Sequence, residues 1–277
     1  MGKHAKTLTI IETARAILAA HNPMTVRQVY YQLVSRQVIE NNRSQYQAVS
    51  NALVDARQEG AIPWEWIEDR LRRPRAVSMW DDLPDFANTV CKAYRRDVWP
   101  TQEMLVEVWL EKDALSGIFE TLLDPYGVTL NVGRGYDGWD SIHNAAMRYL
   151  DWGGDVAILY FGDLDPSGED MVRSLGVRLG FFQTSPEITK CALTLADVER
   201  YHLPPDFTKA TDSRQAAFVL KWGDIAVELD ALPIDVLENR LEYEVRQRLD
   251  LSALTTIRDL ETTERRQMAE LLKSLKN

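Results

Sequence analysis

Cysteine and histidine are scarce in this sequence of 277 residues, and the sites that they usually build are therefore excluded. The two cysteines, Cys91 and Cys191, lie far apart in the chain, and the four histidines show no CxxC or HxxxH spacing. This pattern supports neither a disulfide framework nor a structural zinc site. We therefore expect any bound metal to be held by oxygen ligands.

Long apolar runs are also missing. The longest, VAILYF at residues 156–161, is far shorter than the ~20 residues that a membrane-spanning helix needs. The first residues, MGKHAKTLTIIETARAI, have neither a long apolar stretch nor a small-residue cleavage site, so they do not resemble a signal peptide. Only 14 glycines and 11 prolines occur, which excludes collagen-like and low-complexity classes. We expect a cytoplasmic, nucleoid-associated protein that has no membrane partner.

Positive charge is in deficit, with a formal net charge of −10, but it is unevenly distributed. Residues 1–80 contain 11 Lys and Arg against 7 Asp and Glu, so the front of the chain is basic and the rest is acidic. The run DRLRRPR at residues 69–75 contacts successive DNA phosphates if it lies exposed on one face, and otherwise it is a solvated loop that binds nothing. The arginines that we expect to contact DNA are Arg43, Arg57, Arg70, Arg72, Arg73 and Arg75.

The first sixty residues predict three short helices. Apolar residues recur at helical spacing over residues 7–20, and Asn22-Pro23 must end that helix. Two Ser or Thr residues are each followed three positions later by Gln, which is typical of a helix start, and Gly60 is expected to stop the third helix. The two capping pairs are Thr25 with Gln28 and Ser44 with Gln47.

The segment after these helices completes a pattern that is typical of a DNA-binding domain. Residues 61–75 are aromatic and tolerant of β-structure, which predicts a hairpin or an arm. Three compact helices followed by a basic β-like extension indicate a winged helix, a variant of the helix-turn-helix motif. We assign residues 1–100 to this domain.

From about residue 104 the period of the apolar residues changes, and strands alternate with helices. This alternation predicts an α/β fold with a mainly parallel sheet that is covered by helices on both faces, in a domain of residues 101–277. Residues 196–234 are expected to be rich in loops, with further helices from residue 235 onward. The expected strands are residues 104–110, 128–132, 156–161 and 191–195.

Three carboxylates follow these strands, at the sheet edge where ligands bind in such folds. Glu111 comes directly after the first strand, and Asp163 and Asp165 come directly after the buried VAILYF strand. An Asp-x-Asp pair with a Glu from a neighbouring strand can form an all-oxygen site for hydrated Mg²⁺, for which Mn²⁺ can substitute. The alternative is that these acids are turn formers and helix caps, since Asp-Pro-Ser-Gly is good turn chemistry in any protein.

Several motifs in this chain resemble those of a known family. WLEKDALSGIF at 109–119 and ILYFGDLDPSGEDM at 158–171 look like the toprim fold, which carries a Glu after its first strand and Asp-x-Asp after a later one. TVRQVYYQLV at 25–34 is similar to the catalytic motif of the topoisomerase VI A subunit and the related meiotic double-strand-break protein. VELDALP at 227–233 resembles a segment that those proteins carry beyond toprim. The chain looks like a short, free-standing homologue of the A subunit, and the agreement spans roughly residues 20 to 240.

The tyrosine pair of this motif contains the candidate nucleophile. Tyr30 shares an apolar stripe with Val29 and should be buried, whereas Tyr31 points about 100° away and can reach solvent or DNA. A phenol has a pKa of ~10 and needs a nearby cation to attack phosphorus at neutral pH, which Arg27 can supply. The family resemblance also implies that the second tyrosine of the pair, Tyr31, is the nucleophile. The alternative is that both rings only pack in a helical core.

The resemblance implies transesterification, in which Tyr31 attacks a DNA phosphate and forms a 5′-phosphotyrosyl bond. It implies that Mg²⁺ on Glu111, Asp163 and Asp165 stabilises the charge on the phosphate and on the leaving oxygen. It also implies a homodimer on double-stranded DNA, in which the tyrosine of one chain meets the metal site of the other. The chain contains no ATPase region, so we expect strand passage to need a separate ATPase subunit.

Two other functions fit the same residues. The first is a toprim nuclease that hydrolyses DNA with metal-activated water, in which Tyr31 is structural or binds phosphate. The second is a DNA-binding or assembly subunit whose acids neutralise one another or hold a structural ion. Tyr31→Phe separates the first alternative from transesterification, and Asp163→Asn separates the second from both enzymes.

Overall fold

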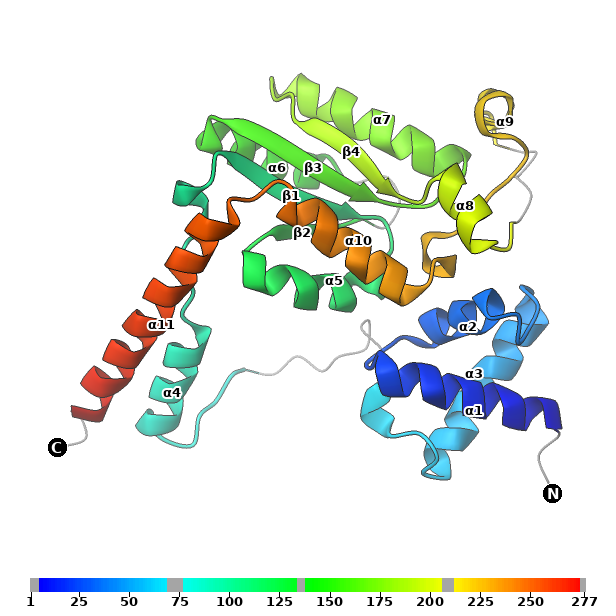
Figure 1. Cartoon of the computed structure of the whole chain (residues 1–277), viewed down its shortest axis with the longest axis horizontal. Helices are drawn as coiled ribbons and strands as arrows, with labels where there is room; N and C mark the ends of the chain where they lie inside the picture. The colour runs from blue at the N-terminus through cyan, green and yellow to red at the C-terminus, as the bar shows by residue number, and fades with distance from the viewer. Residues whose placement is uncertain (1–4, 69–76, 134–137, 206–211, 275–277) are drawn as a thin grey trace.

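The computed structural model describes residues 5–68, 77–133, 138–205 and 212–274, and it has an α/β fold with one four-stranded sheet (Figure 1). Three helices at the N-terminus lie beside the sheet, and two further helices, one of them C-terminal, extend away from it (Figure 1). Within the described ranges, no helix is both long enough and apolar enough to cross a membrane.

The N-terminal helices begin and end largely where the sequence predicts. Thr25 caps the second helix, since its hydroxyl accepts the Gln28 N–H at 3.3 Å and the Gln28 side chain accepts the Thr25 N–H at 2.6 Å. The third helix starts earlier than predicted, because Asn42 and not Ser44 accepts the first free N–H, that of Gln45 at 3.0 Å. The helices are α1 (Ala5–Ala20), α2 (Val26–Ser35) and α3 (Arg43–Gln58).

The hairpin expected after α3 is not formed by the part of that segment that the structure describes. Residues 61–68 contain the 3-10 turn η1 (Trp64–Trp66) and a single parallel bridge between Ile67 and Met24. This bridge ties the end of the segment back to the start of α2. Four of the arginines expected to bind DNA lie outside the described residues: Arg70, Arg72, Arg73 and Arg75.

The sheet is entirely parallel, with strand order β2-β1-β3-β4, as the alternation of strands and helices predicts. The last strand begins four residues earlier and ends three residues earlier than the predicted 191–195. Thr194 is the reason, because it caps helix α8 (Leu195–Tyr201) through the Asp197 N–H and so ends the extended chain. The strands are β1 (Met104–Leu110), β2 (Thr129–Val132), β3 (Asp155–Phe161) and β4 (Glu187–Ala192).

Helices cover both faces of this sheet, as predicted. Side chains alternate along each strand, so Val108 packs with α5 and α10 on one face, whereas Trp109 packs with α6 and α7 on the other. Residues 196–234 contain two helices, α8 and α9, in a region expected to be mostly loop. These helices are α5 (Ser116–Leu123), α6 (Trp139–Trp152), α7 (Pro166–Phe181), α8 (Leu195–Tyr201), α9 (Gln215–Trp222) and α10 (Ile234–Arg246).

The N-terminal helices share a continuous apolar core with the sheet unit. Leu33 on α2 and Leu232, just after the 3-10 turn η6 (Leu229–Ala231), belong to the same buried cluster. The Gln32 side chain donates a hydrogen bond to the Leu232 carbonyl at 3.3 Å, and both groups are buried. These contacts fix α2 against the segment that precedes α10, and they determine where Tyr31 lies.

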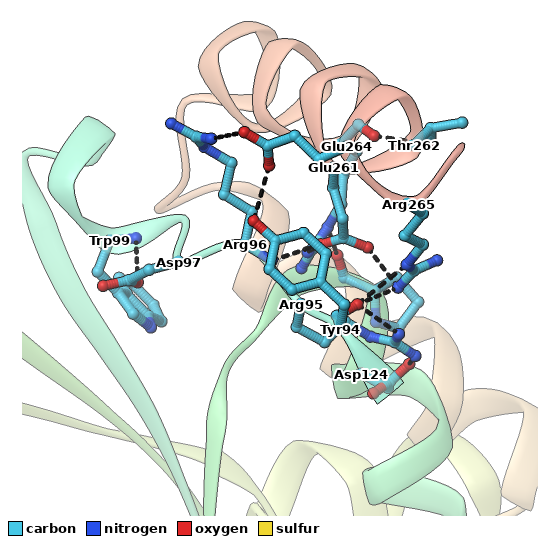
Figure 2. Close-up of polar contacts among 12 residues, drawn as sticks. Tyr94, Arg95, Arg96, Asp97, Trp99, Asp124, Glu261, Thr262, Glu264 and Arg265 are labelled. Carbon is cyan, nitrogen blue, oxygen red and sulfur yellow. Dashed lines mark hydrogen bonds and ion pairs between the residues drawn. The ribbon is translucent and has the colours of Figure 1, made fainter. Parts of the chain in front are cut away.

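Helix α4 (Leu83–Ala93) packs against the C-terminal helix α11 (Leu251–Ser274), and not against α1–α3 (Figure 1). Figure 2 shows the polar contacts at the base of this pair. Glu264 accepts a hydrogen bond from the Tyr94 hydroxyl at 2.7 Å and pairs with Arg96. Buried Glu261 accepts the Arg96 N–H at 2.8 Å. Acids on α11 therefore hold the chain between α4 and β1.

Candidate functional site

Two of the three predicted acids, Glu111 and Asp163, meet at the C-terminal edge of the sheet. Glu111 follows β1 and Asp163 follows β3, and these strands are neighbours. The Glu111 carboxylate accepts the Asp163 N–H at 2.9 Å. Gly162 permits this approach, because a Cβ at that position would lie 2.6 Å from the same Glu111 oxygen. The sequence therefore predicted the meeting of the two strand ends correctly.

Each aspartate already has a protein partner. Lys112, which the sequence analysis did not consider, places its ammonium 2.9 Å from one Asp163 oxygen, and the Leu229 N–H donates to the other at 2.8 Å. Asp165 caps α7 by accepting the Gly168 N–H at 2.6 Å. Asp165 therefore acts as a helix cap, as the alternative reading predicted, and it also lines the cavity described below.

Negative charge is in excess at this sheet edge. Burial raises the pKa of Glu111 to about 7, and the charges of Asp163 and Asp165 add to this effect. Burial also raises the pKa of Asp163, against the opposing influence of Lys112. Carboxylates crowded in this way are stabilised by a bound cation.

Helix α2 brings Tyr31 and Arg27 close to the same edge of the sheet. Arg27 pairs with Glu228, and its Nε donates to Asp230 at 3.2 Å. A cavity of about 430 Å³ is lined by Tyr31, Glu228, Asp163 and others, including Asp165. The nucleophile candidate and two of the predicted acids thus share one cavity of a single chain, although they are far apart in the sequence.

Tyr31 is buried, with 8% of its surface exposed, so the expectation that it reaches solvent is wrong, whereas contact with DNA stays a prediction. The docking of α2 on η6 covers the side of the helix that the sequence suggested was free. Tyr30 is also buried, as predicted, and its hydroxyl donates to Asn41 at 2.9 Å. Tyr31 also lines the cavity described above, which gives a substrate a route to its side chain.

The Tyr31 phenol is held in its neutral form. Burial raises its pKa well above the usual range, and hydrogen bonding to Glu228 and the charge of Asp230 raise it further. Arg27 acts to lower the pKa, as expected, but it does not offset the carboxylates. The guanidinium lies over the ring, 5.3 Å from its centroid, and its charge is shared with two acids.

Three charged residues complete the site without having been predicted: Lys112, Glu228 and Asp230. The ammonium of Lys112 also lies 3.3 Å from Glu228, so it bridges the strand-end acids and the segment that contacts α2. Asp230 is 2% exposed, burial raises its pKa to about 7, and its Oδ1 has no hydrogen-bond partner among the described residues. For Glu228 and Asp230 the sequence did contain a signal, because these two acids alternate with apolar residues in VELDALP at 227–233.

The two DNA-binding arginine candidates that the structure describes differ in their surroundings. Arg43 is exposed at the first residue of α3. Arg57 stacks on Trp64 at 4.7 Å and donates to the Leu53 carbonyl at 3.3 Å. Burial lowers the pKa of Arg57. Arg43 is therefore the better placed of the two to contact a phosphate.

The donor chemistry of the site suits a hard divalent cation. Within the described residues, no three Asp, Glu, His or Cys side chains converge as metal ligands do. The carboxylates of Glu111, Asp163 and Asp165 are the oxygen donors that Mg²⁺ prefers. Because Lys112 lies on Asp163, a metal ion would have to take the place of its ammonium there.

The raised pKa of Glu111 predicts a pH-dependent stability. An unfolded Glu has a pKa of ~4.3, so between about pH 4.5 and 7 the folded chain binds more protons than the unfolded chain. The free energy of unfolding should therefore fall as the pH rises through this window. Glu111→Gln keeps an acceptor for the Asp163 N–H and removes the titration, so it should stabilise the protein at pH 8 by ~2 kcal/mol and have little effect at pH 4.5.

Urea denaturation at both pH values, without divalent cations, measures this effect. Glu199→Gln on the surface of α8 is the matched control and should leave the pH dependence unchanged. An equal effect of Glu111→Gln at both pH values would contradict the assignment.

No protein-family model matches the chain, and no curated protein matches it significantly.

Proposed function

We propose that this protein cleaves double-stranded DNA by transesterification through Tyr31. The observation that carries the proposal is the shared cavity, which brings Tyr31 and the Asp163–Asp165 pair together in one place. A nucleophile beside strand-end carboxylates is the combination that phosphoryl transfer to a side chain requires. In this proposal the N-terminal helices act as a winged-helix unit and the sheet acts as a toprim unit.

The proposed reaction uses Glu228 as the proton acceptor. The Tyr31 hydroxyl gives its proton to the Glu228 carboxylate as its oxygen bonds to phosphorus. The bond from phosphorus to the 3′ oxygen breaks, and that oxygen leaves with the bonding electrons and takes a proton from water. Since the phenol is neutral at rest, a hydrogen-bonded base is needed for attack at neutral pH.

Magnesium bound through Glu111, Asp163 and Asp165 would supply positive charge to the phosphate and to the leaving oxygen. Arg43 would contact the DNA backbone from the start of α3. A homodimer would cut both strands, and strand passage would require a separate ATPase subunit.

One observation favours a second candidate, a metal-dependent nuclease. Tyr31 is buried and its pKa is raised, which is unfavourable for a nucleophile and suits a residue that only positions a phosphate. Water activated at the same acids would then hydrolyse the DNA and leave free ends. The two candidates differ in whether the product is attached to protein.

Incubation of the protein with supercoiled plasmid and Mg²⁺ or Mn²⁺, stopped with detergent, tests the proposal. Transesterification predicts cleaved DNA that enters a gel only after protease treatment. Chelation of the metal, or Asp163→Asn, should reduce cleavage by about 100-fold or more, because the transition-state charge loses its stabilisation. Asp155→Asn, at the exposed opposite end of β3, is the matched control and should cleave normally.

The other outcomes each contradict the proposal in a different way. Free ends that need no protease treatment support the nuclease. DNA that is bound but never cut, with the same binding by Asp163→Asn, supports a binding subunit.

A further inference from the structure

Lys112 is a positive charge that lies among the acids of the candidate site. It directly follows Glu111, just after β1, and its ammonium lies 2.9 Å from Asp163 and 3.3 Å from Glu228. Only 17% of its side chain is exposed. Burial acts to lower the pKa of Lys112, but the surrounding carboxylates, Asp163 first among them, outweigh burial and raise the pKa. Lys112 therefore stays charged, and the acids hold it in place.

Both carboxylate oxygens of Asp163 are already engaged. Oδ2 lies against the Lys112 ammonium, and Oδ1 accepts the buried Leu229 N–H at 2.8 Å. A divalent cation that binds Asp163 through Oδ2 would have to share this oxygen with the ammonium. Two cations at one oxygen repel each other strongly in a buried site, where water screens them poorly. The ammonium and the divalent cation therefore compete for Asp163.

The ammonium has a second carboxylate beside it. When it leaves Asp163, Lys112 can keep its contact with Glu228, which is 3.3 Å away. Asp230 adds negative charge next to Glu228, and its Oδ1 accepts no hydrogen bond from any described residue. The displaced ammonium would thus stay within the site and continue to repel the cation.

We propose that Lys112 is an internal counter-ion, which neutralises Asp163 until a divalent cation takes its place and thereby limits the affinity of the site for that cation. This inference rests on the proposed function, because it takes Asp163 as a metal ligand. Removing the ammonium frees an oxygen for the cation, but it leaves the acids uncompensated when no cation is bound. Lys112→Met should therefore bind the cation more tightly and be less stable in its absence.

Calorimetric titration with Mn²⁺ at pH 8 measures the affinity, at a pH where Glu111, whose pKa is about 7, is mostly ionised. Lys112→Met should bind Mn²⁺ at least about tenfold more tightly than the wild type. Lys112→Arg keeps the charge and should stay within about threefold of the wild type. Lys190→Met is the matched control, because Lys190 is equally buried beside Asp163 but pairs with Glu169, which is not a predicted ligand. It should also stay within about threefold.

Thermal unfolding supplies a readout of the opposite sign. In a chelator, Lys112→Met should unfold about 5 °C or more below the wild type, because a buried carboxylate has lost its cation. Saturating Mn²⁺ should raise the midpoint of this variant by more than that of the wild type, since tighter binding to the folded state gives more stabilisation. Lys112→Gln keeps a neutral donor for Asp163 and should show the same gain in affinity, so it serves if Lys112→Met does not fold.

Asp163→Asn distinguishes failure of this inference from failure of the proposed function. If it abolishes Mn²⁺ binding, the cation lies on the predicted acids. Unchanged or weaker binding by Lys112→Met and Lys112→Gln would then overturn the inference and leave the proposed metal site in place. If Asp163→Asn binds Mn²⁺ as tightly as the wild type, or if no variant binds it, the proposed metal site fails and the inference fails with it.

Discussion

Tyr31→Phe is expected to lower the amount of protein-linked DNA to below about one-thousandth of the wild-type level, because phenylalanine lacks the oxygen that bonds to phosphorus. The ring would still fill its place beside Arg27, so the fold and the cavity should be retained. The measurement is the retention of end-labelled DNA with denatured protein in the presence of Mg²⁺.

Tyr30→Phe is the matched control, since it removes the neighbouring hydroxyl on the same helix. That hydroxyl donates to Asn41 at 2.9 Å, so its loss should cost about 1 kcal/mol of stability and leave the DNA linkage intact. A linkage that survives Tyr31→Phe would contradict the assignment of the nucleophile. An equal loss in both variants would point to damage of the helix and not to chemistry.

Arg148→Met is expected to destabilise the protein by about 3 kcal/mol, because it leaves a buried carboxylate without its cation. Glu107 lies in the middle of β1 with 1% of its surface exposed, and Arg148 contacts both of its oxygens, at 2.8 and 2.9 Å. The hydroxyl of Tyr149 and the amide of Asn131 remain as neutral donors, so the effect should lie at the lower end of the usual range for such a loss. Urea denaturation measures the effect.

The control for this variant is an ion pair of similar length on the surface. Arg173→Met breaks a 2.6 Å pair with Asp170 on α7, in which Arg173 is 67% exposed. Solvent screens that pair, so the cost should be below about 1 kcal/mol. If Arg148→Met were as mild as Arg173→Met, Glu107 would not depend on its cation for its place in the sheet.

The elements that the sequence predicted correctly depend on local signals. The Thr25–Gln28 capping pair fixes the start of α2 within four residues of chain, and the run VAILYF becomes β3 because a central parallel strand is buried on both faces. The meeting of Glu111 and Asp163 follows from the parallel sheet, since the carboxyl ends of parallel neighbours lie at one edge.

The features that the sequence did not predict depend on contacts between distant segments. The period of α2 indicates which side of the helix is apolar, but the burial of Tyr31 arises from residues 228–232, some two hundred residues later. Lys112 and Asp230 are ordinary charged residues until the fold places them beside Asp163 and Arg27. Helix α4 was missed although it carries a local start signal, since Asp82 caps it by accepting the Asp85 N–H at 2.8 Å; only its packing partner α11 lies at the far end of the chain.

Covalent attachment of DNA to Tyr31 is the central claim, and mass spectrometry of the trapped complex tests it most directly. The complex formed with Mg²⁺ is denatured, digested with nuclease and then with protease, and the peptides are sequenced. The proposed function predicts a nucleotide joined through its 5′ phosphate to the peptide that contains Tyr31, at the Tyr31 oxygen. Cleaved DNA with no peptide adduct, or an adduct on another residue, would contradict it.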